Sequence, residues 1–183
     1  MRTSAPELRR RARQIKLLLM DVDGVMTDGR IYYLPQAADD RLIETKGFHS
    51  RDGLGIRLAH EAGLKTGVIS GRTSPIVEHR VRELGIHYAE LDTLEKLGAY
   101  ERILFAAELR DEDVCYIGDD VVDLPVLKRV GLAVGVADGH PFLRRYLHYR
   151  TRCLGGAGAV RETIELILAA QNKLNAAFKP FLR

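Results

Sequence analysis

Acidic residues gather in two short segments of this sequence. Asp21 and Asp23 follow the apolar run Ile15–Met20, and a second group follows the apolar run Val114–Ile117. The members of that second group are Asp119, Asp120 and Asp123. Carboxylates that share one crevice repel each other and need a cation, and hard oxygen ligands suit Mg²⁺ better than Zn²⁺. The acidic residues therefore predict a magnesium site.

Carboxylates beside magnesium are suited to breaking a phosphate ester. Asp21 could attack phosphorus as a nucleophile, because covalent catalysis by Asp divides hydrolysis into two easier steps. Asp23 could protonate the leaving oxygen and later deprotonate water. The phosphate also needs donors. Ser70 and the backbone amides around Gly71 precede a predicted helix, where an anion is favoured, and Lys96 could stabilise the developing negative charge.

Each of these motifs also has a purely structural interpretation. Asp-x-Asp-Gly is common in turns held by side-chain hydrogen bonds, and Gly118-Asp119-Asp120 could cap a helix. Ser-Gly-Arg at 70–72 is common in loops, and a lone Lys96 could be a solvated side chain. All of them lie at expected strand ends or helix starts, and this joint placement favours a shared site.

The elements that must position these residues alternate along the chain. Short runs that are apolar on both faces, separated by helical patterns, indicate a parallel sheet covered on both sides. The predicted strands are Ile15–Met20, Thr66–Ile69, Val114–Ile117 and Leu132–Val136, and the predicted helices are Pro6–Lys16, Leu54–Ala62, Pro75–Leu84, Leu94–Glu108, Leu124–Val130 and Val160–Asn175. This order predicts an open, doubly wound α/β domain, in which the carboxyl ends of the strands share one edge.

The segment 29–48 does not fit this alternation. Ile31–Tyr33 and Leu42–Thr45 have strand composition, and the stretch between them contains Pro35 and polar residues. We expect a protruding β-hairpin at about 29–48 and no large cap domain. The whole chain, 1–183, is predicted to be a single domain that ends in a helix and tail at about 160–183.

Composition narrows the possible partners and compartment. The chain has 183 residues, of which 46% are hydrophobic, and a net charge of +3, a smaller excess than nucleic-acid binders carry. The basic segment Pro6–Lys16 could contact RNA or a membrane, but a solvated helix that leads into the first strand explains it better. The two cysteines lack metal or disulfide spacing, and no apolar run approaches the roughly 18 residues of a membrane span. We expect a cytoplasmic protein that binds neither nucleic acid nor membrane.

The motifs together resemble those of the haloacid dehalogenase-like phosphatases. The run Met20–Gly29, Met-Asp-Val-Asp-Gly-Val-Met-Thr-Asp-Gly, is similar to the first motif of the 3-deoxy-D-manno-octulosonate 8-phosphate phosphatases. The resemblance covers most of the chain from Ile15 to Lys173, and it extends through Phe48–Gly53, Val68–Arg72, Tyr116–Pro125, Val136–Pro141 and Gly155–Glu162.

This resemblance implies a Mg²⁺-dependent phosphomonoesterase of lipopolysaccharide precursor synthesis, with roles for particular residues. Asp21 would be the nucleophile, Asp23 the acid/base and a metal ligand through its backbone carbonyl, and Asp119 a further ligand. Asp120 and Asp123 would support them. Substrate contacts would fall on His49, Ser50, Arg51, Asp52, Gly53, Arg57, Gly71, Arg72, Arg80 and Lys96. An Arg fork suits the planar carboxylate of a sugar acid.

The family also implies a homotetramer in which the hairpins form a shared barrel. A two-stranded hairpin is marginal alone and exposes unpaired edges, which agrees with such pairing. The Gly155–Glu162 segment and the tail with Arg183 could add a mobile lid. Two departures from the family stand out: a longer hairpin around Pro35–Arg41, and Asp92 where relatives commonly have Gly.

Two alternatives stay open at this level. A relative that cleaves the 9-phosphate of a nine-carbon sialic-type acid would share the same motifs. A non-enzymatic receiver-like phospho-acceptor also gathers acids, a hydroxyl and a Lys around magnesium, but it carries its phosphorylated Asp on a later strand. The strand Thr66–Ile69 and its exit offer no such Asp.

Overall fold

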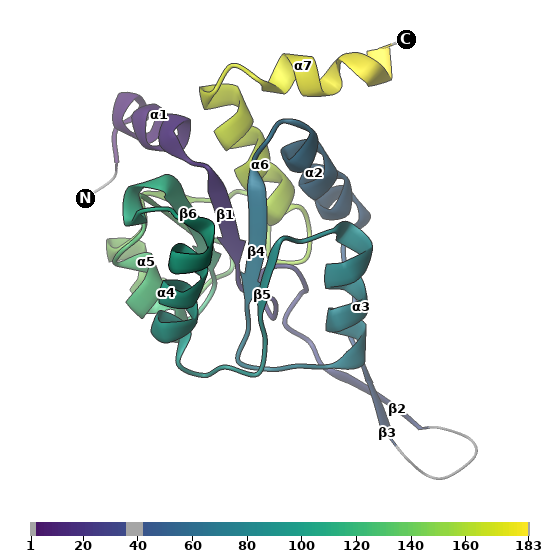
Figure 1. Ribbon diagram of the computed structural model, residues 1–183. Coiled ribbons are helices and arrows are strands. Elements are labelled where there is room, and N and C mark those ends of the chain that lie inside the picture. Colours follow the sequence, from purple (N-terminus) through teal and green to yellow (C-terminus); the bar gives the residue numbers. More distant parts are fainter. Residues whose placement is uncertain (1–2, 36–41, 183) are drawn as a thin grey trace.

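A computed structural model describes residues 3–35 and 42–182 of the chain. Its centre is a parallel sheet with strand order β5-β4-β1-β6-β7-β8 (Figure 1). The strands are β1 (Leu17–Met20), β4 (Lys65–Ile69), β5 (Tyr88–Glu90), β6 (Val114–Gly118), β7 (Leu132–Gly135) and β8 (Tyr149–Arg150). The central strand β1 is buried along its whole length, as expected of a strand covered on both faces.

Helices cover both faces of this sheet. One layer contains α1 (Ala5–Gln14), α2 (Ser50–Glu61), α3 (Pro75–Leu84) and α6 (Ala159–Ala170), and the opposite layer contains α4 (Lys96–Ala107) and α5 (Leu124–Leu127). Side chains alternate along β1, so Leu18 and Met20 face the first layer while Leu17 and Leu19 face the second. The predicted doubly wound α/β fold is thereby confirmed.

The hairpin stands apart from the main sheet. Strands β2 (Tyr32–Pro35) and β3 (Leu42–Thr45) pair only with each other, antiparallel, and project beyond the carboxyl ends of the central strands (Figure 1). The predicted hairpin is confirmed within the described residues. Most of the longer segment noted around Pro35–Arg41 lies outside them.

Two predicted helices end earlier than expected, and two short strands were not predicted. The predicted helix Val160–Asn175 is two helices, because Asn172 has a left-handed backbone (φ 58°) that separates α6 from α7 (Leu174–Phe178). The helix predicted at Leu124–Val130 ends at Leu127. The edge strands β5 and β8 were missed because two or three residues are too short to show a periodic pattern.

None of the helices within the described part of the chain combines the length and apolarity that a membrane span needs. The last α-helix, α7, lies at the end of the molecule opposite the hairpin (Figure 1).

Candidate active site

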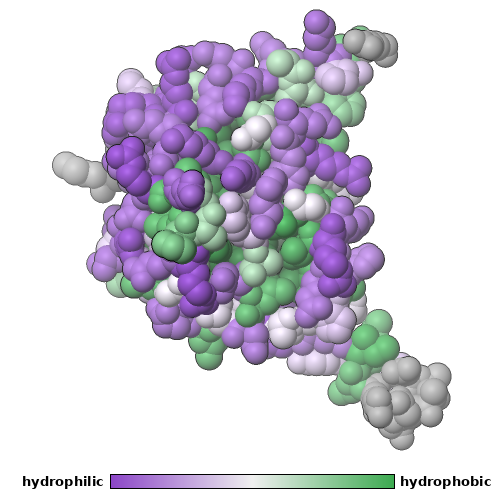
Figure 2. All heavy atoms as spheres, in the orientation of Figure 1, coloured by the Kyte–Doolittle hydropathy of each residue, from purple (hydrophilic) through white to green (hydrophobic). Residues whose placement is uncertain are grey.

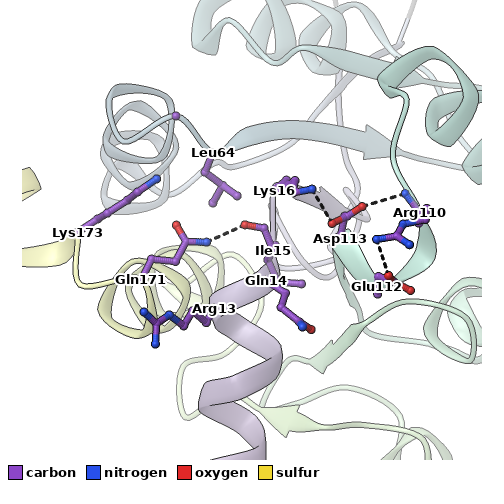
Figure 3. A pocket seen from close by; sticks show the side chains of 11 residues that line it. Arg13, Gln14, Ile15, Lys16, Leu64, Arg110, Glu112, Asp113, Gln171 and Lys173 are labelled. Atoms are coloured by element: carbon purple, nitrogen blue, oxygen red, sulfur yellow. Dashed lines mark hydrogen bonds and ion pairs between the residues drawn. The ribbon is translucent and has the colours of Figure 1, made fainter.

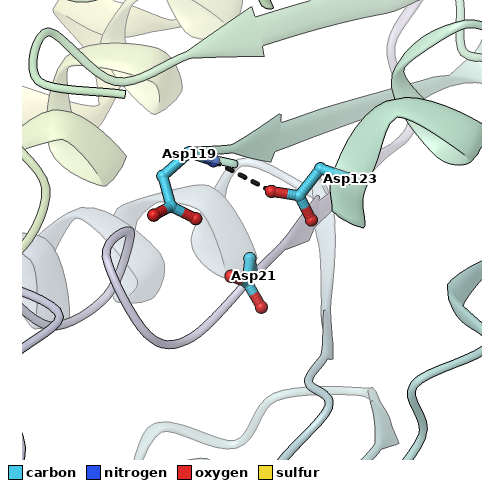
Figure 4. A group of neighbouring side chains, drawn as sticks. All are labelled: Asp21, Asp119 and Asp123. Carbon is cyan, nitrogen blue, oxygen red and sulfur yellow. Dashed lines mark hydrogen bonds between the residues drawn. The ribbon is translucent and has the colours of Figure 1, made fainter. Parts of the chain in front are cut away.

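The acidic residues come together where β1 and β6 end. These strands are parallel neighbours with Met20 paired to Ile117, so the residues that follow them, Asp21 and Asp119, emerge side by side. One carboxylate oxygen from each of Asp21, Asp119 and Asp123 lies within 4.8 Å of the other two (Figure 4). The predicted convergence at one sheet edge is therefore present.

Glycines make room for this packing. Gly24 has φ +90°, and a Cβ added to it would overlap the carboxylate of Asp119. Likewise, a Cβ on Gly118 would overlap the carboxylate of Asp123. Both positions therefore require Gly, because any larger residue would overlap one of the two carboxylates.

Asp123 is held on all sides by neighbouring groups. Its Oδ1 accepts hydrogen bonds from Lys96 Nζ (2.6 Å) and the Tyr116 hydroxyl (2.7 Å). Its Oδ2 accepts from the backbone N–H groups of Asp119 (2.9 Å) and Asp120 (3.2 Å). Asp123 therefore fixes the loop that carries Asp119. The Asp120 side chain bonds the Val121 N–H (2.7 Å) and caps the short turn that follows.

Lys96 brings a buried positive charge to the site. It begins helix α4 and is 4% exposed, with Nζ 2.8 Å from Asp21 Oδ1. Burial alone would lower the pKa of Lys96, but the charges of Asp123 and Asp21 outweigh it and raise that pKa. Lys96 is therefore positively charged beside the proposed nucleophile.

One lysine does not neutralise the carboxylates. Burial, with the charge of Asp123, raises the pKa of Asp21 to about 6. Burial, with the charges of Asp21 and Asp123, raises the pKa of Asp119 to about 8. An all-oxygen donor set with uncompensated negative charge fits Mg²⁺. The carboxylates close enough together to hold it are those of Asp21, Asp119 and Asp123, and the Asp23 backbone carbonyl stays a predicted ligand.

The strand next to β1 places the proposed phosphate donors. Ser70 directly follows β4, is 2% exposed, and its Oγ accepts a hydrogen bond from the Arg72 N–H (3.2 Å). Gly71 lies closely against Leu94, since an added Cβ would be 3.0 Å from that side chain. The Arg72 guanidinium extends toward the hairpin and pairs with Glu44 (2.9 Å).

Asp92 lies in the loop between β5 and α4. Its φ of 57° is left-handed, a conformation that Gly adopts freely and Asp tolerates better than most residues. Asp92 can therefore keep the loop shape that a Gly would give at this position.

The segment 49–53 forms the start of α2, and the side chains of His49 and Asp52 cap helices. His49 Nδ1 accepts the Arg51 N–H (3.2 Å) and caps the helix. Both oxygens of Asp52 bind backbone N–H groups at the start of α6, those of Gly158 (3.1 Å) and Arg161 (2.7 Å). The Asp52 carboxylate therefore caps α6, and its contact with substrate stays a prediction.

Two of the proposed substrate arginines, Arg57 and Arg80, lie on helices α2 and α3. Arg57 and Arg80 line a cavity of about 240 Å³ between α2 and α3, together with Ser50 and Gly53. Arg80 pairs with Glu83 (2.8 Å). Helices α2 and α3 supply the whole lining of this cavity, and the contact of Arg57 and Arg80 with substrate stays a prediction.

The possible lid segment is packed into the fold. Gly156 N–H donates to Val25 O (2.9 Å), and Gly155 N–H donates to Asp138 (2.9 Å). The helix that follows is buried against the sheet. Gly155–Glu162 therefore packs beside the Asp21 loop in this structure, its role as a lid stays a prediction, and Arg183 lies outside the described residues.

Sequence reasoning missed Lys46. This residue follows β3, and its ammonium lies 2.8 and 2.9 Å from the two carboxylate oxygens of Asp23. A Lys at the end of a hairpin strand carries no distinctive pattern. The structure was needed to connect it with Asp23.

A larger hollow, of about 510 Å³, lies at the opposite end of β1 (Figure 3). Several of its polar groups are paired with one another: Lys16 with Asp113 (3.0 Å), Arg110 with Glu112 (2.8 Å), and Gln171 with the Ile15 carbonyl (2.7 Å). This pairing leaves the carboxyl edge as the better candidate site.

The raised pKa of Asp119 predicts that the folding stability of the metal-free protein depends on pH. A carboxyl whose folded pKa is about 8 binds more protons when folded, so stability falls as pH rises from about 4 to about 8. Metal-free Asp119→Asn should therefore melt above metal-free wild type at pH 8, with the difference shrinking toward pH 5. Calorimetry in a chelator measures this, and a difference that grows toward pH 5 would contradict it.

Known proteins resemble the chain over nearly its whole length. A curated 3-deoxy-D-manno-octulosonate 8-phosphate phosphatase from Yersinia pestis is 45% identical over 173 residues, covering 94% of this chain and 90% of that protein. Its crystal structure superposes with a TM-score of 0.88 at 44% identity, with 94% and 90% coverage. No protein-family model matches the chain.

A further structure shows such a protein with its ligands. The phosphatase of the same name from Moraxella catarrhalis, in complex with a magnesium ion, a phosphate ion and KDO, superposes with a TM-score of 0.91. It is 36% identical, and the match covers 97% of this chain and 99% of that one.

Proposed function

Because the chain belongs to the 3-deoxy-D-manno-octulosonate 8-phosphate phosphatase family of haloacid dehalogenase-like proteins, we propose that it hydrolyses that phosphate ester with Mg²⁺. The products are the free eight-carbon sugar acid and phosphate. The observation that carries this function is the position of Asp21, which lies at the end of β1 between Lys96 and Asp119.

Asp21 is the nucleophile of this mechanism. Lys96 binds its Oδ1, which leaves the other oxygen to attack phosphorus. A bond forms between Asp21 and phosphorus while the bond from phosphorus to the sugar oxygen breaks, and Asp23 gives its proton to that oxygen. Asp23 then takes a proton from water, which attacks the phosphoenzyme and restores Asp21.

The remaining residues hold the phosphoryl group and limit its charge. Mg²⁺, held by Asp21, Asp119 and the Asp23 carbonyl, supplies charge neutralisation at the phosphoryl oxygens. Ser70 and the Gly71 N–H bind the phosphate, and Lys96 stabilises the negative charge that develops.

The sugar acid is the part of the substrate that distinguishes relatives. Arg72 is half-exposed at the same sheet edge as Asp21, which suits it to the substrate carboxylate. We place the enzyme in the cytoplasm, in lipopolysaccharide precursor synthesis. Its two cysteines, Cys115 and Cys153, are free thiols, which agrees with a reducing compartment.

A substrate panel tests the proposed function. Phosphate release should be fastest with the eight-carbon acid 8-phosphate, and at least about tenfold slower with a nine-carbon acid 9-phosphate, since a misplaced carboxylate loses its Arg partner. Comparing kcat/KM for the two sugar phosphates distinguishes the two activities. Preference for the nine-carbon substrate would establish the alternative activity.

The hairpin is proposed to build a homotetramer. Tyr32, Tyr33, Leu34, Leu42 and Ile43 are exposed on it by 43 to 65%. Figure 2 shows this apolar surface at the base of the hairpin, on a molecule whose visible face is otherwise mostly polar. Apolar exposure of this kind marks an interaction surface, and pairing with other hairpins would cover it.

Charges placed on the hairpin should therefore dissociate the assembly. Leu34 and Ile43 face each other across the strands, and both are already about half exposed in the isolated chain. The double variant Leu34→Glu with Ile43→Glu should reduce the mass measured by light scattering from about four chains to one. Turnover of the sugar acid should fall more than turnover of an aryl phosphate.

Phe105→Glu is the matched control, since Phe105 is 89% exposed on α4, away from the hairpin. It should leave the mass unchanged. A double hairpin variant with wild-type mass and sugar-acid turnover would show that the hairpin neither assembles the oligomer nor completes the site.

A further inference from the structure

We propose that Lys46 is the positioning residue for the acid/base Asp23, and that it ties this group to the β-hairpin. The inference rests on the role that the proposed function gives to Asp23. Lys46 directly follows β3, so one residue joins the hairpin to the loop where the leaving group is protonated.

Lys46 lies among carboxylate oxygens. Its ammonium donates a hydrogen bond to Oδ2 of Asp23 (2.9 Å), and it lies at ion-pair distance from Oδ1 of Asp23 (2.8 Å) and from Glu44 Oε1 (3.4 Å). Because its hydrogen bond goes to Asp23, we infer that Lys46 affects the reaction through that residue.

Burial makes this contact specific. The Lys46 side chain is 1% exposed, whereas that of Asp23 is 22% exposed. An ammonium removed from water must keep its anionic partners, so it holds them more strongly than a solvated lysine would. The hydrogen bond to Oδ2, together with the ion-pair contact at Oδ1, restricts rotation of the Asp23 carboxylate.

The same ion pairs continue into the hairpin. Glu44 lies in β3 and accepts from the Arg72 guanidinium (2.9 Å) through its other oxygen. A chain of charges thus runs from Asp23 through Lys46 and Glu44 to Arg72. Movement of β3 would be transmitted to the acid/base and to a proposed substrate arginine together.

Dependence on the leaving group tests this role. General acid catalysis matters most when the leaving oxygen is a poor leaving group, as in an alkyl phosphate, and little when it is p-nitrophenolate. We expect Lys46→Met to lower kcat for the sugar phosphate by about 10- to 100-fold. KM should change less than about twofold, and the burst of p-nitrophenolate should slow less than about threefold.

Lys65→Met is the matched control. Lys65 is exposed at the amino end of β4, whereas the carboxylates lie at the carboxyl ends of the strands. Its loss should therefore change the rate for neither substrate. Lys46→Arg, which keeps the charge, should recover part of the sugar-phosphate rate. Equal losses on both substrates in Lys46→Met would overturn the proposal.

A double-mutant cycle asks whether Lys46 acts through Asp23. In the Asp23→Asn background, Lys46→Met should change the sugar-phosphate rate by less than about twofold, because the group it positions is gone. A full additional loss in that background would show that Lys46 acts elsewhere, and the proposal would fail.

Two further arms keep the test decisive. If Lys46→Met does not fold, Lys46→Gln, whose amide can still donate to one Asp23 oxygen, must show the same dependence on leaving group or the proposal fails. If wild type cleaves other alkyl phosphates but not the eight-carbon sugar, the proposed substrate is wrong. Lys46 is then tested with the best alkyl phosphate.

Discussion

Asp21→Asn is expected to abolish phosphatase turnover, by at least about a thousandfold, while leaving the fold intact. The amide keeps the shape of the side chain but cannot attack phosphorus. Because the carboxylate is buried beside Asp123 with a raised pKa, its removal should not lower the melting temperature of metal-free protein. Steady-state kinetics and calorimetry measure the two effects.

Glu112→Gln provides the control for this substitution. Glu112 is an exposed acid at the opposite end of the sheet, and its neutralisation should leave turnover unchanged. Retention of more than a few per cent of activity by Asp21→Asn would reject Asp21 as the nucleophile. Loss of activity together with unfolding would be resolved by Asp21→Ser, which must also be inactive when folded.

Removal of the metal is expected to have an effect of similar size. A chelator should lower turnover by more than about a hundredfold, and Mg²⁺ should restore it. Ca²⁺ should restore little, since its larger and looser coordination shell would misplace the attacking oxygen. Full activity in metal-free protein would contradict the proposed metal site.

Binding can be followed separately from activity. Mg²⁺ should raise the melting temperature of wild type, because it compensates the crowded charges of Asp21 and Asp119. The increase should be much smaller in Asp119→Asn. An equal increase in both proteins would place the ion elsewhere.

Much of the fold follows from short-range patterns in the sequence. The apolar runs of β1 and β6 predicted a sheet covered on both faces, and the shared carboxyl edge of parallel strands predicted that Asp21 and Asp119 would meet. Pro75 marked the start of α3, whose predicted bounds are those observed.

The rest depends on contacts between distant segments. Asp52 belongs to a motif segment, yet α6, more than a hundred residues later, uses both its oxygens. Lys46 has no motif of its own and is defined by its distance from Asp23. The break between α6 and α7 depends on one left-handed residue, Asn172, which helical periodicity cannot reveal.

The most direct test of the account is to locate the phosphoenzyme. Wild-type protein mixed with 3-deoxy-D-manno-octulosonate 8-phosphate and Mg²⁺ would be quenched within one turnover and reduced with borohydride, which converts an aspartyl phosphate to homoserine. Mass spectrometry of the peptides should find homoserine at position 21 and unmodified Asp at 23 and 119. Homoserine at another position, or phosphate release without any modified Asp, would contradict the proposed mechanism.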